Sequence, residues 1–164
     1  MEITRVTITE RGPVPRKMAK QHRQASRQAY QAIAEKHHQE NTAKRFTREH
    51  ALAAGYRKRG GEEHPFGSKA FWNSYTGRKL KKRGHMLPLV NTGTTRDRAR
   101  MATITVTTNR GQLKYQVNAL NYQPWTREEF TRILPAEARA LGQHWDQIYN
   151  REFNQDLNHG LRFV

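Results

Sequence analysis

The segment from Met101 to Leu120 constrains the fold more than any other part of the chain, because it predicts a β-hairpin. In its first half, apolar residues alternate with threonines, as in a strand with one buried face: Ala102, Ile104 and Val106. Asn109-Arg110-Gly111 then forms the expected turn, with glycine where a positive φ is favoured. The second half alternates again: Leu113, Tyr115, Val117 and Ala119. A hairpin of this kind needs another element to cover its apolar face.

A C-terminal helix is the predicted cover. Pro124-Trp125 ends the hairpin, and Thr126-Arg-Glu-Glu129 has the pattern of a capping box that starts a short helix. Pro135 stands where proline is favoured, in the first turn of a longer helix over about residues 136–157. Apolar residues recur along it at helical spacing: Ala138, Leu141, Trp145, Ile148, either Tyr149 or Glu152, Phe153 and Leu157. We expect this stripe to lie against the hairpin.

The N-terminal part of the chain predicts further helices. From Arg16 to about Gln39 there is no glycine or proline, and residues of high helix propensity dominate. The apolar stripe of this helix consists mostly of small residues: Met18, Ala25, Ala29 and Ile33. Such a stripe packs loosely on its own chain or packs against a neighbouring protein. A second helix is expected over Thr42–Ala54, with Phe46 and Leu52 as its larger apolar residues.

The fold class expected from these elements is α+β in a single domain over residues 1–164. Residues 2–9 alternate Val6 and Ile8 with threonines, which predicts an N-terminal strand that joins the hairpin (about 101–120) in a small antiparallel sheet. The parts are a helical N-terminal arm (13–54), a basic extended loop region (55–100), and the hairpin with the C-terminal helix (101–158). Within the loop region, Lys69–Lys82 could hold one helix that Gly77 weakens. Residues 160–164 add an edge strand or remain free.

Composition limits what this domain can bury. Only 35% of the 164 residues are hydrophobic, and the mean hydropathy is −1.02. We therefore expect a small core and a chain that leans on partners. The absence of cysteine excludes disulfides, cysteine zinc sites and thiol catalysis. No apolar run approaches the about 20 residues of a membrane span, and the N-terminus lacks the apolar core of a signal peptide. We therefore expect no membrane partner, and a reducing cytoplasm, or a particle assembled there, as the setting.

The formal net charge of +16 is concentrated in the first part of the chain. Residues 1–100 hold 23 basic and 8 acidic side chains, whereas residues 101–164 hold 7 and 6. A basic block of this kind indicates a polyanion or an acidic protein surface as partner. The alternative is a solvated basic face that only maintains solubility.

The sequence contains no recognisable catalytic or metal-binding arrangement. The eight histidines include no His-Glu-x-x-His motif, and no pair combines ligand spacing with a third ligand, so surface or capping histidines are favoured. There is no phosphate-binding glycine loop, no nucleophile-elbow serine and no supported pair of catalytic carboxylates. We therefore expect no enzyme, no metal and no cofactor. A weaker alternative is a metal-dependent nuclease that uses His85 and Asn91.

The densest basic run follows three aromatic residues, Phe71, Trp72 and Tyr75. Its basic residues are the predicted contacts with DNA or an acidic partner: Arg78, Lys79, Lys81, Lys82 and Arg83. Basic residues beside aromatic ones suit contact with a phosphate backbone and stacking on an exposed base. The alternative is that the aromatic residues anchor the loop to the core while the charges stay solvated. No motif for base-specific readout is present.

The middle of the chain also resembles a known family. Tyr56-Arg-Lys-Arg59, Tyr75 with Lys79–Lys82, and Gly84-His-Met-Leu-Pro-Leu-Val-Asn-Thr-Gly93 are similar to a basic loop and Pro-Leu-Val-x-Thr/Ser-Gly segment of tailed-phage head-to-tail proteins. There a hairpin, an aromatic-proline corner and a terminal helix follow, as they do here over roughly residues 45–155. One departure is Thr94-Thr95-Arg96, where that family often carries a leucine-arginine pair.

The resemblance implies a neck or tail-completion protein that joins a DNA-filled capsid to a tail. It implies a virion location, a ring of commonly 6 or 12 copies, contacts with portal or adaptor and tail proteins, and non-specific contact with packaged DNA. An assembly loop would make inter-subunit contacts: Pro88, Leu89, Val90, Asn91, Thr92 and Gly93. Leu89 and Val90 would be its apolar anchors and Gly93 its pivot, unless Gly93 is an ordinary turn. The alternative function is a basic protein that binds nucleic acid non-specifically.

Overall fold

The computed structural model describes residues 16–90, 92–117 and 124–158, and their contacts group into two compact units. The hairpin unit comprises residues 16–41, 102–115 and 135–158, and the basic unit comprises residues 42–101 and 116–134. The sequence analysis treats the chain as one domain, whereas the contacts form these two groups. The predicted strand over residues 2–9 and the tail at 160–164 lie outside the described residues.

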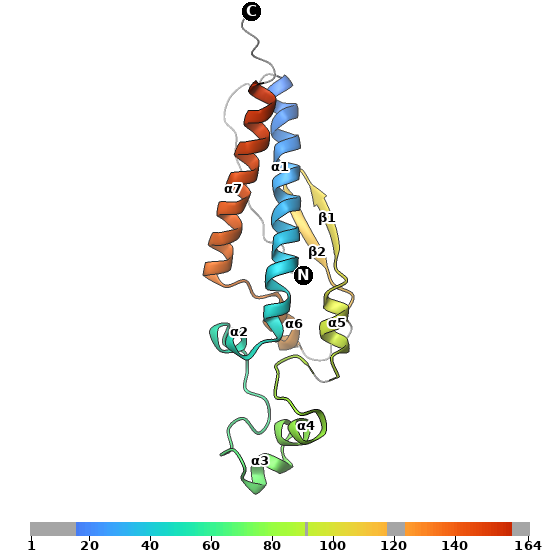
Figure 1. Cartoon of the computed structure of the whole chain (residues 1–164), viewed down its shortest axis with the longest axis vertical. Helices are drawn as coiled ribbons and strands as arrows, with labels where there is room; N and C mark the ends of the chain where they lie inside the picture. Colours follow the sequence, from blue (N-terminus) through green and yellow to red (C-terminus); the bar gives the residue numbers. More distant parts are fainter. Residues whose placement is uncertain (1–15, 91, 118–123, 159–164) are drawn as a thin grey trace, which may run out of the picture. The chain divides into compact units, whose positions relative to one another are not determined.

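The hairpin unit contains two long helices and a two-stranded antiparallel sheet, which confirms the α+β class. Its elements are α1 (Arg16–Lys36), the π-helical turn η1 (His37–Asn41), β1 (Thr103–Thr107), β2 (Arg110–Lys114) and α7 (Pro135–Asn158). Figure 1 shows α1 between α7 on one side and the hairpin on the other. The long N-terminal and C-terminal helices are thus confirmed, and α7 begins at the predicted proline.

The element packed against the hairpin is α1, and α7 packs along α1. This corrects the expectation that the C-terminal helix covers the hairpin. The buried face of α1 is built mainly from small residues: Ala25, Ser26, Ala29, Tyr30 and Ala34. Small side chains let the sheet approach closely, and a Cβ on Gly111 of β2 would lie 2.7 Å from the Tyr30 carbonyl oxygen. The alanine stripe therefore holds the hairpin directly against the helix backbone.

Aromatic side chains join α7 to α1. The Trp145 ring meets the Tyr30 ring edge to face, with centroids 5.8 Å apart. His22 Nδ1 lies 2.7 Å from the Tyr149 hydroxyl oxygen, within hydrogen-bonding distance. The stripe predicted for α7 thus meets α1 through its larger residues.

The hairpin has a tighter turn than predicted. Thr107 pairs with Arg110, so the turn is Thr108-Asn109, and Gly111 lies in β2. Gly111 lies in the strand and not in the turn because β2 closely approaches α1 at this position, where a residue with a Cβ would not fit. In β1 the threonines are exposed and the alternating aliphatic residues are half-buried, as predicted. The second strand ends at Lys114, short of the predicted Leu120.

The described residues of the basic unit form six short helical segments. They are η2 (Ala43–Phe46), α2 (Arg48–Ala53), α3 (Lys69–Asn73), α4 (Tyr75–Arg83), α5 (Thr94–Ala99) and α6 (Pro124–Thr131). The continuous helix expected over Thr42–Ala54 is wrong, because Thr47 is extended and its side chain caps α2 by accepting from the His50 N–H. Most of the described residues in 55–100 lie outside helices, and three short helices, α3, α4 and α5, interrupt the extended region that was expected there.

The break between α3 and α4 falls at Ser74. Ser74 is extended, and its hydroxyl accepts from the Gly77 N–H and donates to the Phe71 carbonyl oxygen. Gly77 does not weaken this region as predicted. A Cβ there would lie 2.1 Å from the Phe71 carbonyl oxygen, so glycine permits the close contact between the two helices.

Helix α6 contributes Phe130 to the core of the basic unit. Its first residue also shows that the predicted capping box is wrong. Phe130 packs on Phe46, with ring centroids 5.7 Å apart. Because α6 begins at Pro124, Thr126 lies inside the helix and does not cap it. Glu129 is only 3% exposed and serves another purpose.

Candidate functional site

Most of the excess positive charge belongs to the basic unit. Residues 42–101 and 116–134 hold 17 lysines and arginines against 6 aspartates and glutamates, which gives +11 of the formal +16. Charge of one sign at this density attracts polyanions and repels other cations. The exposed cations of this unit are therefore the candidate functional residues.

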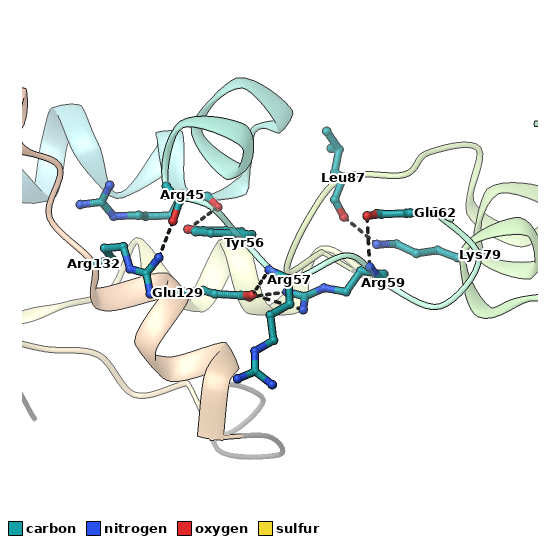
Figure 2. A network of polar contacts seen from close by, with 10 residues as sticks. Arg45, Tyr56, Arg57, Arg59, Glu62, Lys79, Leu87, Glu129 and Arg132 are labelled. Carbon is teal, nitrogen blue, oxygen red and sulfur yellow. Dashed lines mark hydrogen bonds and ion pairs between the residues drawn. The ribbon is translucent and has the colours of Figure 1, made fainter. Parts of the chain in front are cut away.

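A buried carboxylate fixes the first basic segment. Glu129 Oε1 accepts from the Arg57 backbone N–H at 2.7 Å, and both Glu129 oxygens accept from the Arg59 guanidinium. Figure 2 shows Arg57 and Arg59 converging on this carboxylate. The Arg57 guanidinium lies over the Trp125 ring, 5.2 Å from its centroid. The positioning role of Glu129 could not be predicted, because no local sequence pattern links it to residues 70 positions earlier.

Neighbouring hydrogen bonds hold the chain just before that segment (Figure 2). The Tyr56 hydroxyl donates to the Arg45 carbonyl oxygen at 3.3 Å, and the Arg132 guanidinium donates to the Ala54 carbonyl oxygen at 2.5 Å. Arg45 itself is buried, and its Nη1 lies 2.7 Å from His50 Nε2. The segment Tyr56–Arg59 is thus anchored to the core of its own unit.

Lys79 is half-buried, whereas the other predicted contact residues are exposed. Its Nζ donates to the Leu87 carbonyl oxygen at 2.6 Å and lies 6.0 Å from the Tyr75 ring centroid. Burial lowers the pKa of Lys79 below its ordinary value of 10.5; the charge of Arg59 lowers this pKa further, and that of Glu62 opposes the shift. Lys79 therefore attaches the loop after α4 to the helix.

The remaining predicted contacts are exposed on α4. Thr76 and Gly77 are buried and Leu80 is half-buried on one side of the helix. At 100° per residue, the opposite side carries Tyr75, Arg78 and Lys82, and Lys81 lies at its margin next to Gly77; all four are exposed. Arg83 is exposed at the end of the helix. In the part of the chain that the structure describes, Arg78, Lys81 and Lys82 form no ion pair with a carboxylate.

The aromatic residues divide between an anchor and an exposed group. Phe71 is buried, whereas Phe66, Trp72 and Tyr75 are 73%, 40% and 48% exposed. The Trp72 ring meets the Phe71 ring edge to face at 5.2 Å, and the Phe66 ring centroid lies 6.0 Å from that of Trp72. One ring therefore anchors the region, as in the second alternative above, and three rings are exposed to solvent.

The predicted assembly loop is partly internal. Val90 is 3% exposed and belongs to the core of the basic unit, while Pro88 and Leu89 are half-buried. Thr92 is exposed, and Gly93 adopts a φ of 92° as the N-cap of α5. Asn91 lies outside the described residues. Of the two proposed apolar anchors, Val90 therefore anchors the loop to its own unit.

Cations also gather around His85. Its pKa is lowered by partial burial and by the positive charges of Lys79, Arg96 and Arg83. Lys79 and Arg83 belong to α4, and Arg96 belongs to α5.

Among the described residues, no three histidine, aspartate or glutamate side chains are grouped closely enough to hold a metal ion. No helix within the described ranges has both the length and the apolar character needed to cross a membrane. The chain matches no protein-family model, no curated protein and no solved structure.

Proposed function

We propose that the chain is a structural subunit of a phage virion neck, a head-to-tail connector or tail-completion protein that acts in a ring. The observation that carries this proposal is the outer edge of β1. Within the described residues, β1 pairs only with β2, so its other edge presents backbone groups that have no strand partner. An isolated two-stranded sheet is marginally stable, and an open edge is a template for pairing with another chain.

The shallow burial of the hairpin unit supports the same proposal. The aliphatic side chains of its sheet and of α7 are only half-buried: Ile104, Val106, Leu113, Leu141 and Ile148. A subunit that docks beside copies of itself would bury more of this apolar surface. The contact is thus expected to stabilise the unit as well as to build the ring.

The role of this subunit is mechanical, and its partners are copies of the same chain, a portal or adaptor ring and tail proteins. Its location is the junction between head and tail of a virion. The resemblance to neck proteins motivates these partners, and the β1 edge that pairs with no strand among the described residues gives the means of association.

Negative-stain electron microscopy of the full-length chain, alone and mixed with a portal and a tail-tube protein, tests the proposal. The expected result is closed rings that bind one of the two partners. A chain that forms no rings under any of these conditions would contradict it.

A further inference from the structure

We infer that the junction of α3 and α4 is a binding site for single-stranded nucleic acid. The site, here called the α3–α4 ledge, is formed by three exposed aromatic and three exposed basic residues: Phe66, Trp72, Tyr75, Arg78, Lys81 and Lys82. This activity is separate from ring formation, which concerns the hairpin unit.

The cations of the ledge are available for phosphate groups. Arg78, Lys81 and Lys82 lie on the exposed side of α4, and among the described residues none of them is neutralised by a carboxylate. Arg78 Nε donates to the Ser74 carbonyl oxygen at 3.2 Å, which directs this side chain back toward the junction with α3. Charge is therefore concentrated beside the aromatic residues, as needed where a backbone and its bases are bound together.

The aromatic residues provide stacking surfaces. The Trp72 ring contacts the buried Phe71 ring edge to face, and the Phe66 ring contacts both of them. The three rings therefore form one cluster. Tyr75 begins the next helix, one residue past the bend at Ser74. A planar ring that is fixed on one side and exposed on the other can stack on any base, without regard to sequence.

The ledge is held rigidly before any ligand binds. Ser68 caps α3 by accepting from the Phe71 N–H, and Ser74 caps α4 by accepting from the Gly77 N–H. The Thr76 N–H donates to the Gly60 carbonyl oxygen at 3.0 Å, which attaches the start of α4 to the preceding loop. Because these bonds fix the backbone, binding would require little additional ordering.

Single strands fit this surface better than other polyanions. The bases of a duplex are already stacked on one another, so exposed rings gain little from it. An acidic protein would satisfy the cations but leave the rings exposed. An anionic membrane requires a broad apolar face, whereas the ledge offers three exposed rings beside its cations: Phe66, Trp72 and Tyr75.

The test is fluorescence anisotropy of a labelled single-stranded oligothymidine of about 15 nucleotides, titrated with the full-length chain over a range of salt concentrations. Wild type is expected to bind it more tightly than a duplex of equal length and more tightly than vesicles of phosphatidylserine. Trp72→Ala and Tyr75→Ala should each weaken binding about tenfold. Replacing both Lys81 and Lys82 by glutamine should reduce the slope of log K against log salt by about 1.4.

Arg139→Gln is the matched control, because Arg139 is an exposed cation on α7 in the other unit. It should leave both affinity and salt slope nearly unchanged. Circular dichroism of each variant separates a folding defect from a loss of binding, and Tyr75→Ala removes a ring that is 48% exposed. Equal or tighter binding of duplex or vesicles, or unchanged affinity in both aromatic variants, would overturn the inference. Oligomeric state is measured on the same samples by sedimentation, so loss of rings and loss of nucleic-acid binding are scored separately.

Discussion

Glu129 of α6 accepts hydrogen bonds from the guanidinium of Arg59, a residue 70 positions earlier in the chain, through both of its carboxylate oxygens. The same carboxylate accepts the Arg57 backbone N–H. One buried acidic group thus fixes the path of a basic segment that would otherwise be repelled by its neighbours. This buried ion pair attaches the basic segment to α6.

Glu129→Ala should therefore destabilise the basic unit. The substitution leaves the Arg57 N–H and the Arg59 guanidinium without their acceptor, which should lower the free energy of unfolding by about 2 to 3 kcal/mol. Urea unfolding followed by tryptophan fluorescence measures the loss. Glu128→Ala is the control, because Glu128 is exposed on the same helix. Equal effects of the two substitutions would show that the ion pair does not contribute as described.

Gly111→Ala tests which helix covers the hairpin. The added Cβ would lie 2.7 Å from the Tyr30 carbonyl oxygen of α1, so the sheet must move away from the helix. We expect a loss of about 1 to 3 kcal/mol in thermal or urea unfolding. Gly142→Ala is the control on α7, where a Cβ meets no neighbouring atom, and it should stabilise by about 0.5 to 1 kcal/mol. A harmless Gly111→Ala would mean that α1 and β2 are not in close contact.

The pKa of Lys79 should respond to Glu62. Burial and Arg59 lower this pKa, whereas the Glu62 carboxylate raises it. Glu62→Gln removes the charge but keeps an oxygen that can accept the Arg59 N–H, so the pKa of Lys79 should fall further. Side-chain NMR titration of the lysine ε-carbons measures the change, with Lys82 as the exposed reference. An unchanged or raised pKa in the variant would contradict the assigned cause.

The same shift predicts the pH dependence of stability. The folded-state pKa of Lys79 lies below its unfolded value, so in the range between the two the unfolded chain binds more protons. The contribution of Lys79 to the free energy of unfolding must then rise as pH increases through that range. Lys79→Met should remove this part of the pH dependence, whereas Lys82→Met should retain it. Identical profiles in the two variants would count against a perturbed Lys79.

Thr105→Lys tests the role of the β1 edge. Thr105 is exposed in the middle of β1, and lysine on an edge strand opposes pairing with another chain. We expect fewer rings in electron micrographs, with an unchanged circular dichroism spectrum. Thr105→Val is the control at the same position, since valine keeps strand propensity and adds no charge. Rings that form equally well in both variants would exclude this edge from the contact.

Local sequence patterns predicted the elements of the hairpin unit, but not their packing. Alternation with a period of two marks β1, and the helix-favouring run and Pro135 mark α1 and α7. The packing of α1 on the sheet depends on Gly111 meeting Tyr30, two residues far apart in sequence. A stripe of small residues predicts that another element approaches closely, but it does not indicate which element. The larger apolar stripe of α7 was therefore wrongly predicted to cover the hairpin, which α1 covers instead.

In the basic unit, the short helices were harder to predict because they depend on tertiary contacts. Ser68 and Ser74 were available as N-cap signals for α3 and α4, yet the surrounding glycines favoured a loop. The local pattern at Thr126 and Glu129 resembles a capping box, but the buried bond to Arg59 determines where Glu129 points. The exposed cations and rings of the ledge were predictable from composition, whereas the internal positions of Lys79 and Val90 were not.

Native mass spectrometry of the full-length chain tests the central claim, that this protein is a ring subunit, most directly. The account predicts a closed assembly with a mass of six or twelve copies of the 19.2 kDa chain, reduced to smaller species by Thr105→Lys. A single species at 19.2 kDa at all concentrations, with or without portal and tail proteins, would contradict it.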